Sequence, residues 1–463
     1  MSDHGLAASR AAMAQLGTSE AAIATFERFY RMLESGEQGI IPEASIEPLG
    51  HVPTLAGVEA DEEQRRAALA KVAVIKLNGG LGTSMGLSGP KTALRVRGEL
   101  TFLDIIARQT LALRRQYGVD LPLLLMNSFR TRAESLAILA AYPELPVAGL
   151  PLDFLQNAEP KLTADGLEPV VWPADPELQW CPPGHGDVYV SLQGTGLLDA
   201  LRAKGIRYIF LSNADNLGAT CDPDIAAWLL ANDIPYAAEV CERTANDRKG
   251  GHLAVRRSDG RLILRDSAMV APGEDAFFQD NTRHTLFHAN NLWVDLDVLD
   301  ALLRERDGVL GLPIIVNRKT VDPTDANSTH VVQIESAMGA AIEVFEGSQA
   351  IAVPRNRFRP VKSTNELLLV ASDIFELDAD AQLVSTIDHA EPAITLGPAY
   401  KFVPDFLTRF PDGVPSMREC TSLAVPADVT FGARVRCVGD VVVAGAPSGA
   451  IPDDAVLTGV FDS

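Results

Sequence analysis

Apolar and polar residues follow two different periods along the chain, and the change of period marks the elements that we expect. Residues 18–33 (TSEAAIATFERFYRML) repeat apolar positions three and four apart, which predicts an amphipathic helix with Ser19 as its N-cap. We expect this helix to pack on the rest of the protein through one apolar face, made of Ile23, Phe26, Phe29, Tyr30 and Leu33.

From residue 71 the pattern becomes an alternation of strands and helices. Continuous apolar runs at 71–77 (KVAVIKL), 121–127 and 207–216 are typical of buried strands, and amphipathic helices are predicted at 101–118 and 195–205. This βαβ order predicts an α/β fold with a doubly wound, mixed or parallel sheet. Ligands of such sheets bind beyond the carboxyl ends of the strands. A glycine-rich loop and the polar segment SNADN both fall at such ends.

The last part of the chain has a different pattern of apolar and polar residues. Residues 418–459 consist of short Val-rich pieces broken by Gly, Pro and Asp, without helical periodicity. Such pieces predict stacked rungs of a small β-solenoid, a left-handed β-helix, with a small sandwich as the alternative. We therefore expect three parts: an α/β domain at 71–403, a helical segment at 1–70 packed on it, and a β-solenoid at 404–463.

Composition narrows the class of protein. The chain has 463 residues, 47% of them hydrophobic, and a formal net charge of −21. Such a surface repels nucleic acid and anionic lipid, so neither is expected as a partner. The five cysteines have no CxxC spacing, no secretory h-region is present, and no apolar run reaches the length of a membrane span. We expect a reduced, cytoplasmic protein.

The loop KLNGGLGTSMGLSGPK (76–91) carries the candidate chemistry. It is not a Walker A motif, because Pro90 stands where that motif needs glycine before its lysine, and proline has no N–H. It is not a Rossmann fingerprint either, because Gly80 and Gly82 are followed by Gly86, one residue late. A glycine-rich backbone that ends on Lys91 suits a nucleoside triphosphate, and a purely structural loop is the alternative.

This loop resembles the signature of eukaryotic-type UTP–glucose-1-phosphate uridylyltransferases (UDP-glucose pyrophosphorylases). Eight further blocks resemble that family in the same order from about residue 71 onward, while the N-terminal part matches weakly. These blocks are LQNAEPK (155–161), PPGHGDVY (182–189), FLSNADNLGA (210–219), RKGGHL (248–253), FHANNLWV (287–294), NRKTVD (317–322), QIESAMGAAIEVFEG (333–347) and VPRNRFRPVKSTNELLL (353–369). The resemblance implies a nucleotidyltransferase-like fold, and the formation of UDP-glucose and pyrophosphate from UTP and glucose 1-phosphate.

The reacting groups are all phosphates, so the chemistry needs cations rather than a nucleophilic side chain. Asp215 follows an apolar strand, where its carboxylate can reach a Mg²⁺ ion, although an Asp that ends a strand in an Asx-turn has the same sequence. The resemblance implies that the metal bridges the two substrate phosphates. It also implies that Lys91 and Lys362 are the catalytic cations; without it, Lys362 would be interpreted as a solvated lysine.

The remaining candidates bind substrate. The backbone at Leu81 and Gly82 can offer a donor and an acceptor to uracil, and the resemblance adds Gln156 and Gly184 to this set. His185 lies between two glycines, where it can donate to a phosphate. The positions that the resemblance assigns to the sugar are Asn213, Gly251, Asn291 and Glu335. Each of these polar residues could instead be a satisfied buried group.

Several alternatives stay open. One is the same chemistry on another hexose 1-phosphate or on N-acetylglucosamine 1-phosphate. The wider superfamily usually carries Gly-Thr-Arg at this loop, and Gly82-Thr83-Ser84 stands here instead, which favours the glucose branch. A nicotinamide oxidoreductase and an inactive scaffold are weaker alternatives. In the family the C-terminal solenoid can mediate assembly, so homo-oligomers are possible.

Overall fold

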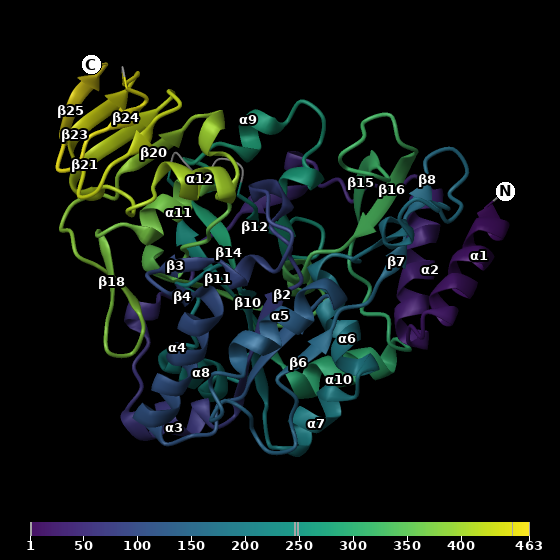
Figure 1. Ribbon diagram of the computed structural model, residues 1–463. Helices are drawn as coiled ribbons and strands as arrows, with labels where there is room; N and C mark the ends of the chain where they lie inside the picture. The colour runs from purple at the N-terminus through teal and green to yellow at the C-terminus, as the bar shows by residue number, and fades with distance from the viewer. Residues whose placement is uncertain (1, 245–246, 248–249, 447, 463) are drawn as a thin grey trace.

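The computed structural model describes residues 2–244, 247, 250–446 and 448–462 (Figure 1). Its centre is a seven-stranded sheet. In spatial order the strands are β17 (Gln349–Ala352), β11 (Tyr236–Glu242), β14 (Leu286–Asp295), β10 (Tyr208–Asn213), β2 (Val72–Asn78), β5 (Leu123–Asn127) and β6 (Asp153–Leu155). Strands β10, β2, β5 and β6 run parallel, whereas β14 is antiparallel to both of its neighbours. The predicted mixed α/β sheet is confirmed.

The two faces of the sheet are covered by different helices, because successive residues of each strand point to opposite sides. On β2, Val72 and Val74 belong to one hydrophobic cluster, and Ala73 and Ile75 belong to the other. The first cluster includes residues of α3 (Glu62–Leu69), α4 (Phe102–Tyr117), α5 (Phe129–Leu139), α8 (Pro223–Ala231), α11 (Thr364–Ala371) and α12 (Val403–Arg409). The second includes residues of α1 (Ser2–Gln15), α2 (Glu20–Glu34), α6 (Val188–Gly194), α7 (Leu197–Ala203) and α10 (Leu296–Glu305).

The helices predicted from the apolar periods form where expected. Helix α2 begins after Ser19, whose hydroxyl accepts the N–H of Ala22, and it buries Ile23, Phe26 and Phe29. Helix α4 ends at Gly118, which adopts φ 63°, the left-handed conformation that closes many helices. These caps explain why both helices start and stop within two residues of the predicted limits.

Smaller sheets flank the central one. Strands β1 (Ile46–Pro48), β12 (His252–Arg256) and β13 (Leu262–Arg265) form one of them, and β15 (Ile315–Thr320), β16 (His330–Glu335) and β8 (Leu162–Thr163) form another. Two-stranded pairs join β3 (Arg95–Arg97) to β4 (Leu100–Thr101), β7 (Glu159–Pro160) to β9 (Trp180–Cys181), and β18 (Phe375–Leu377) to β19 (Leu383–Ser385). The short helix α9 (Asp275–Phe278) follows β13. No helix in the described part of the chain is long and apolar enough to cross a membrane.

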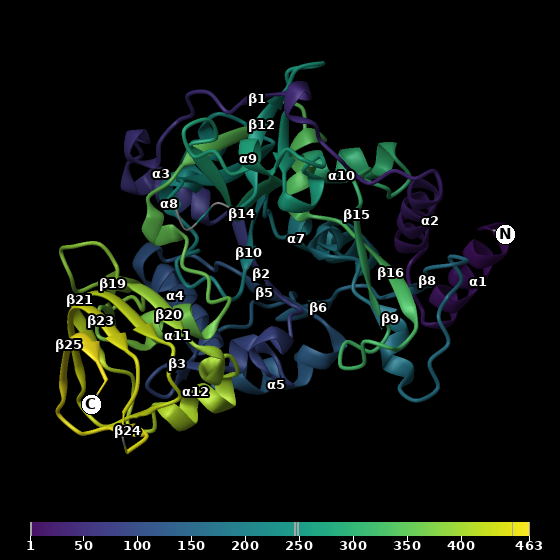
Figure 2. The same cartoon turned by 90° about the horizontal axis from the view of Figure 1, so that it is seen from above.

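The C-terminal strands lie at the opposite end of the molecule from the N-terminal helices (Figures 1 and 2). Strands β20 (Ala393–Leu396), β21 (Ser416–Val425), β23 (Arg436–Val443) and β25 (Val456–Phe461) form a parallel sheet in that order. The two-residue strands β22 (Thr430–Phe431) and β24 (Ala450–Ile451) pair in parallel between them. Buried residues of this sheet share a cluster with the α4 face, so the C-terminal strands pack directly on the main body.

Candidate functional site

The glycine loop leaves the carboxyl end of β2 and folds back on itself. Gly82 and Gly86 adopt φ 63° and 73°, a conformation that residues other than glycine rarely adopt. The Gly82 carbonyl accepts the N–H of Met85 at 2.8 Å, and the Lys91 N–H donates to the Gly80 carbonyl at 3.2 Å. Lys91 is thereby returned to the start of the loop.

The first turn of this loop offers free backbone donors. The N–H groups of Gly80, Leu81 and Gly82 have no hydrogen-bond partner among the described residues. Gly80 is exposed, and no atom lies within 4 Å of the place where its Cβ would stand. A flat ring or an anion can therefore approach the backbone at this point.

Lys91 and Asp215 form the charged centre of the site. The Lys91 Nζ lies 2.6 Å from Asp215 Oδ2, and the two side chains are 14% and 20% exposed. The second carboxylate oxygen, Asp215 Oδ1, is buried and has no hydrogen-bond partner in the described structure. Asp215 follows β10, which lies beside β2 in parallel, so the sheet itself brings the loop and the carboxylate together.

The third predicted charge, Lys362, is attached to the same place through the backbone. The Val361 N–H donates to the Asp215 carbonyl at 3.1 Å, and Asn216 and Pro360 form an antiparallel bridge. Lys362 comes next, immediately before Ser363, the N-cap of α11. Its side chain is exposed and makes no ion pair or hydrogen bond with any residue that the structure describes. The structure therefore brings the segments of Lys91, Asp215 and Lys362 together.

A buried ionic network supports these segments from beneath. Arg357 donates two hydrogen bonds to Glu239, both at 2.7 Å, and Glu239 also accepts from Trp293 Nε1. Burial alone would lower the pKa of Arg357, but the Glu239 carboxylate raises it above its usual value. The network fixes the backbone of 356–361, since the Arg357 carbonyl accepts from Asn216 Nδ2 at 3.2 Å.

Asn291 belongs to this network, which agrees with the alternative of a satisfied buried group that the sequence left open beside a sugar contact. Its side chain is fully buried, and its amide donates to Glu239 at 3.0 Å. The preceding Asn290 is half-buried, adopts φ 57° within β14, and has a side chain without a partner among the described residues. The sequence analysis missed Asn290; two successive asparagines inside a strand were the available signal, because Asn tolerates the left-handed conformation.

Gln156 lies against the glycine loop. A Cβ at Gly79 would stand 2.5 Å from Gln156 Oε1, so the absence of a side chain at Gly79 makes room for this amide. The Gln156 N–H donates to the Asn127 carbonyl at 2.9 Å, which attaches β6 to the end of β5. The neighbouring Asn157 binds Asp187 at 2.7 Å and so connects this side of the site to the helical turn that contains His185.

Gly184, His185 and Glu335 form the second half of the site. Gly184 adopts φ 79°, and a Cβ there would stand 2.5 Å from the Ser336 carbonyl oxygen. His185 Nδ1 accepts the N–H of Met338 at 2.9 Å. Because burial lowers the pKa of His185, the imidazole is neutral and carries its proton on Nε2, where it can donate. Glu335 ends β16 and lies 3.9 Å from Lys319 Nζ.

The last two predicted positions lie along the same edge. Asn213 is the half-buried final residue of β10. Gly251 precedes β12, and its carbonyl accepts the N–H of His288 at 2.8 Å. Burial, and then the nearby His185, lower the pKa of His288 to about 3, which connects this position to the His185 side of the site. Arg248 and Lys249 of the same sequence block lie outside the described residues.

The donor set limits what kind of metal site is possible. Among the described residues, no group of three or more His, Cys, Asp or Glu could hold an ion. Glu159 Oε1 is one buried carboxylate oxygen in the described structure that lacks a partner, and of the predicted site residues Asp215 is the one with such an oxygen. Such a position fits Mg²⁺, which commonly takes one or two carboxylates and completes its shell with substrate phosphates and water.

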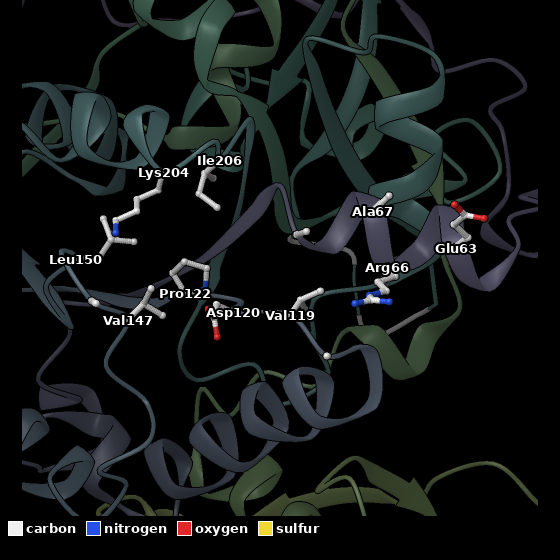
Figure 3. Close-up of a pocket in the computed structure, with 13 residues that line it drawn as sticks. Glu63, Arg66, Ala67, Val119, Asp120, Pro122, Val147, Leu150, Lys204 and Ile206 are labelled. Atoms are coloured by element: carbon white, nitrogen blue, oxygen red, sulfur yellow. The ribbon is translucent and has the colours of Figure 1, made fainter.

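A separate cavity lies away from these residues. A cavity of about 620 Å³ opens at the other edge of the sheet, near the amino end of β5 and the end of α4 (Figure 3). It is lined by Glu63, Arg66, Val119, Asp120 and Lys204, among others, and by none of the predicted site residues. The volume of this cavity does not by itself indicate an active site. Its charged lining residues are Arg66 and Lys204 on one side of the balance and Glu63 and Asp120 on the other, and they form no recognisable catalytic group.

The comparisons with known proteins show which family the chain resembles over most of its length. The family model described as UTP--glucose-1-phosphate uridylyltransferase matches residues 23–437. The chain belongs to this family. The resemblance seen in the sequence blocks is therefore confirmed, and the match extends through α2, where the blocks gave little signal.

Individual members of the uridylyltransferase family match nearly end to end. The UTP--glucose-1-phosphate uridylyltransferase of Solanum tuberosum is 41% identical over 413 residues, which are 87% of this chain and 83% of that protein. A UDP-glucose phosphorylase structure from Trypanosoma brucei has a TM-score of 0.90 at 41% identity, covering 99% of both chains. A UDP-glucose pyrophosphorylase variant from Leishmania major, in complex with UDP-glucose, has a TM-score of 0.91 at 40% identity, covering 99% and 98%.

Proposed function

We propose that the protein makes UDP-glucose and pyrophosphate from UTP and glucose 1-phosphate. The observation that carries this proposal is the pairing of Lys91 with Asp215 beneath an open glycine loop with unused N–H donors. The family supports the same reaction, since its members are named for it. Its rival, transfer to N-acetylglucosamine 1-phosphate, has no structural observation in its favour.

The reaction requires charge to be stabilised rather than a covalent intermediate. A phosphate oxygen of glucose 1-phosphate attacks the α-phosphorus of UTP, and the bond to the bridging oxygen of pyrophosphate breaks in line. Lys91 and Lys362 supply positive charge to the phosphate oxygens as negative charge grows on them. Both lysines are attached to the Asp215 segment, one through its side chain and one through the backbone of Val361.

Mg²⁺ is part of the proposal. Asp215 would hold it through Oδ1, the buried oxygen that lacks a partner. When bound, the ion would draw electron density from the phosphate oxygens and offset the repulsion between the two anionic substrates. Lys91, which neutralises Asp215 in the structure, would then be free to bind phosphate.

The substrates divide between the two halves of the site. The backbone of Leu81 and Gly82, with Gln156 and Gly184, would bind the uracil edge. His185 would donate from Nε2 to the phosphate of the sugar, because Nδ1 already accepts from Met338. Asn213, Gly251 and Glu335 would bind the glucose hydroxyls. We propose that Asn291 acts from within the buried network, and that Asn290 offers the free amide to the sugar.

The domain division and assembly are separate proposals. We propose the division 1–70, 71–403 and 404–463, with the parallel strands β21, β23 and β25 as rungs of a left-handed β-helix. Val442 and Val460 pair across neighbouring strands and are both exposed, so this face could mediate homo-oligomers. Sedimentation of the wild type and of Val460→Lys would test it; a monomeric wild type would overturn it.

A pyrophosphate-release assay tests the activity. Protein, UTP, glucose 1-phosphate and Mg²⁺ should release pyrophosphate, and omission of the metal should abolish release. Parallel reactions with N-acetylglucosamine 1-phosphate should be slower. No release beside a working control enzyme would exclude the proposed function, and equal rates with both sugars would exclude the glucose assignment.

A further inference from the structure

A third lysine lies beneath the site and has no role in the reaction described above. Lys76 is on β2, opposite Ser212 of β10, and only 3% of it is exposed. Its Nζ donates to Ser212 Oγ at 2.8 Å and to the Ala219 carbonyl at 2.5 Å, and it lies 5.6 Å from the centre of the Phe210 ring. It forms no salt bridge with any residue in the described part of the chain.

The two acceptors of Lys76 stand on either side of the loop that carries Asp215. Ser212 is the next-to-last residue of β10, and Ala219 lies on the other side of Asp215, before α8 begins at Pro223. One ammonium group therefore holds the two ends of residues 213–218 together. The opposite side of this loop is held by the 356–361 segment, because Gly218 is packed against the Asn356 carbonyl and Asp215 binds Val361.

Burying a charged lysine costs free energy, so lysine is an unfavourable residue at a position that only has to be filled. Removal from water, and then the positive charge of Arg357, lower the pKa of Lys76 to about 7. An apolar residue of similar length would fill the same space without that penalty. Asp215, Glu239 and Cys221 face Lys76 with negative or ionisable groups, but none of them pairs with it. Both hydrogen bonds persist in either protonation state, since a neutral amine keeps two N–H donors.

Lys76 does not take part in bond making. Its Nζ is enclosed by Ser212, Ala219 and Phe210, so a substrate atom cannot reach it. Its contacts are with backbone and side-chain groups of the loop rather than with the free oxygen of Asp215. Its effect on the reaction must therefore pass through the position of the loop.

We infer that Lys76 is a positioning residue that holds loop 213–219 so that Asp215 Oδ1 points to where the metal and the substrate phosphates meet. The inference rests on the proposed uridylyltransferase function for its kinetic consequence. Its structural part, that Lys76 restrains this loop, can be measured without substrate or metal.

The test compares Lys76→Met with a matched control, Arg114→Met. Arg114 is another cation, partly buried, which donates to the carbonyls of Leu121, Glu144 and Leu145, and none of these hydrogen bonds reaches residues 213–219. Hydrogen exchange of the ligand-free proteins reports on the loop, where the amides of Ala214, Asn216 and Ala219 are hydrogen-bonded and hence protected. Steady-state kinetics with separate kcat and KM values report on the reaction.

We expect Lys76→Met to speed exchange at 214–219 by about tenfold to thirtyfold, the factor that two lost hydrogen bonds represent. We also expect kcat to fall about a hundredfold, because a small displacement of Asp215 would misalign the reacting groups. The KM for glucose 1-phosphate should change less than about threefold. Arg114→Met should speed hydrogen exchange only near residue 114 and should leave kcat unchanged. If Lys76→Met does not fold, Ser212→Ala removes one of the two bonds and should give a smaller change of the same kind.

The outcomes separate the two proposals. Unchanged exchange at 214–219 would overturn the restraint by Lys76. Faster exchange with an unchanged kcat would show that Lys76 is structural only, and would overturn its role in positioning Asp215. A wild type that releases no pyrophosphate would overturn the proposed function and the kinetic part, whereas the exchange data would still decide whether Lys76 holds the loop.

Discussion

Lys91 Nζ and Asp215 Oδ2 are 2.6 Å apart, although 124 residues separate them in the chain. The contact exists because β2 and β10 are parallel neighbours, so the loops that follow them leave the same edge of the sheet. The pair holds a cation and an anion in position before any substrate is present. Only one carboxylate oxygen is used, and the other is left for a ligand of the opposite charge.

Asp215→Asn should therefore lose metal-dependent turnover while the protein stays folded. The amide keeps the shape of the side chain but cannot hold Mg²⁺ with a full charge. By analogy with the removal of one group that stabilises transition-state charge, kcat should fall by about 10² to 10³. Titration of Mg²⁺ against rate, together with circular dichroism, measures both properties. A variant that keeps its Mg²⁺ dependence would remove Asp215 from the metal site.

Lys362→Ala should separate activity from stability more cleanly than any other change. Its side chain is exposed and has no partner in the described structure, so the free energy of unfolding should change by less than about 0.5 kcal/mol. We expect kcat to fall by about 10² to 10³ for loss of a charge at the phosphates. Lys71→Ala, at the opposite end of β2, is the control and should keep wild-type kinetics. Near-normal turnover of Lys362→Ala would exclude its catalytic role.

Gly80→Ala tests whether the glycine loop is open for a ligand rather than for folding. No atom lies within 4 Å of the Cβ it would add, and φ is not positive there, so the fold should tolerate it. A ring or phosphate lying on the backbone would collide with the new methyl group, and we expect the KM for UTP to rise about tenfold or more. Gly50→Ala is equally open and should change nothing. An unchanged KM for Gly80→Ala would place UTP away from this turn.

The sequence predicted the parts of the fold that depend on local pattern. Strand β2 and helix α4 follow from apolar periodicity and from caps such as Gly118, which act within a few residues. The order of strands in the sheet, and the shared core of the C-terminal strands with α4, depend on contacts between distant segments, which no local pattern contains.

The candidate site could be predicted only in part for the same reason. The glycine loop and Asp215 were visible because their residue types suit the chemistry. Burial of Asn291 in a network with Glu239 and Arg357 could not be foreseen, since those residues lie 52 and 66 positions away. Lys76 was visible in the loop sequence, but its role depends on Ser212 and Ala219, which only the folded sheet brings to it.

The two asparagines of β14 should respond differently to substitution. Asn291→Ala leaves Glu239 with one donor fewer in a buried site, so we expect a loss of about 1–3 kcal/mol in the free energy of unfolding. Asn290→Gly removes a free amide and accepts φ 57° without strain, so stability should hold while the KM for glucose 1-phosphate rises. Denaturant unfolding and kinetics on both variants decide. The opposite pattern, with the KM for glucose 1-phosphate affected only by Asn291→Ala, would support the assignment of Asn291 to the sugar.

The stability of the protein should fall with acid because of His288. Burial, and then the nearby His185, lower the pKa of His288 to about 3, compared with 6.5 for a free imidazole. Between these two values the unfolded chain binds a proton that the folded protein rejects, so stability is complete above pH 6.5 and is lost as pH falls. At pH 5 this group should lower the free energy of unfolding by about 2 kcal/mol, from about 1.36 kcal/mol for each pH unit below 6.5.

Urea unfolding at several pH values measures this effect. The free energy of unfolding should change less steeply with pH for His288→Gln than for the wild type, whatever the difference in overall stability. His51→Gln, at an exposed position, should keep the wild-type slope. Equal slopes for all three proteins would mean that His288 accepts its proton in the folded state as readily as in the unfolded chain.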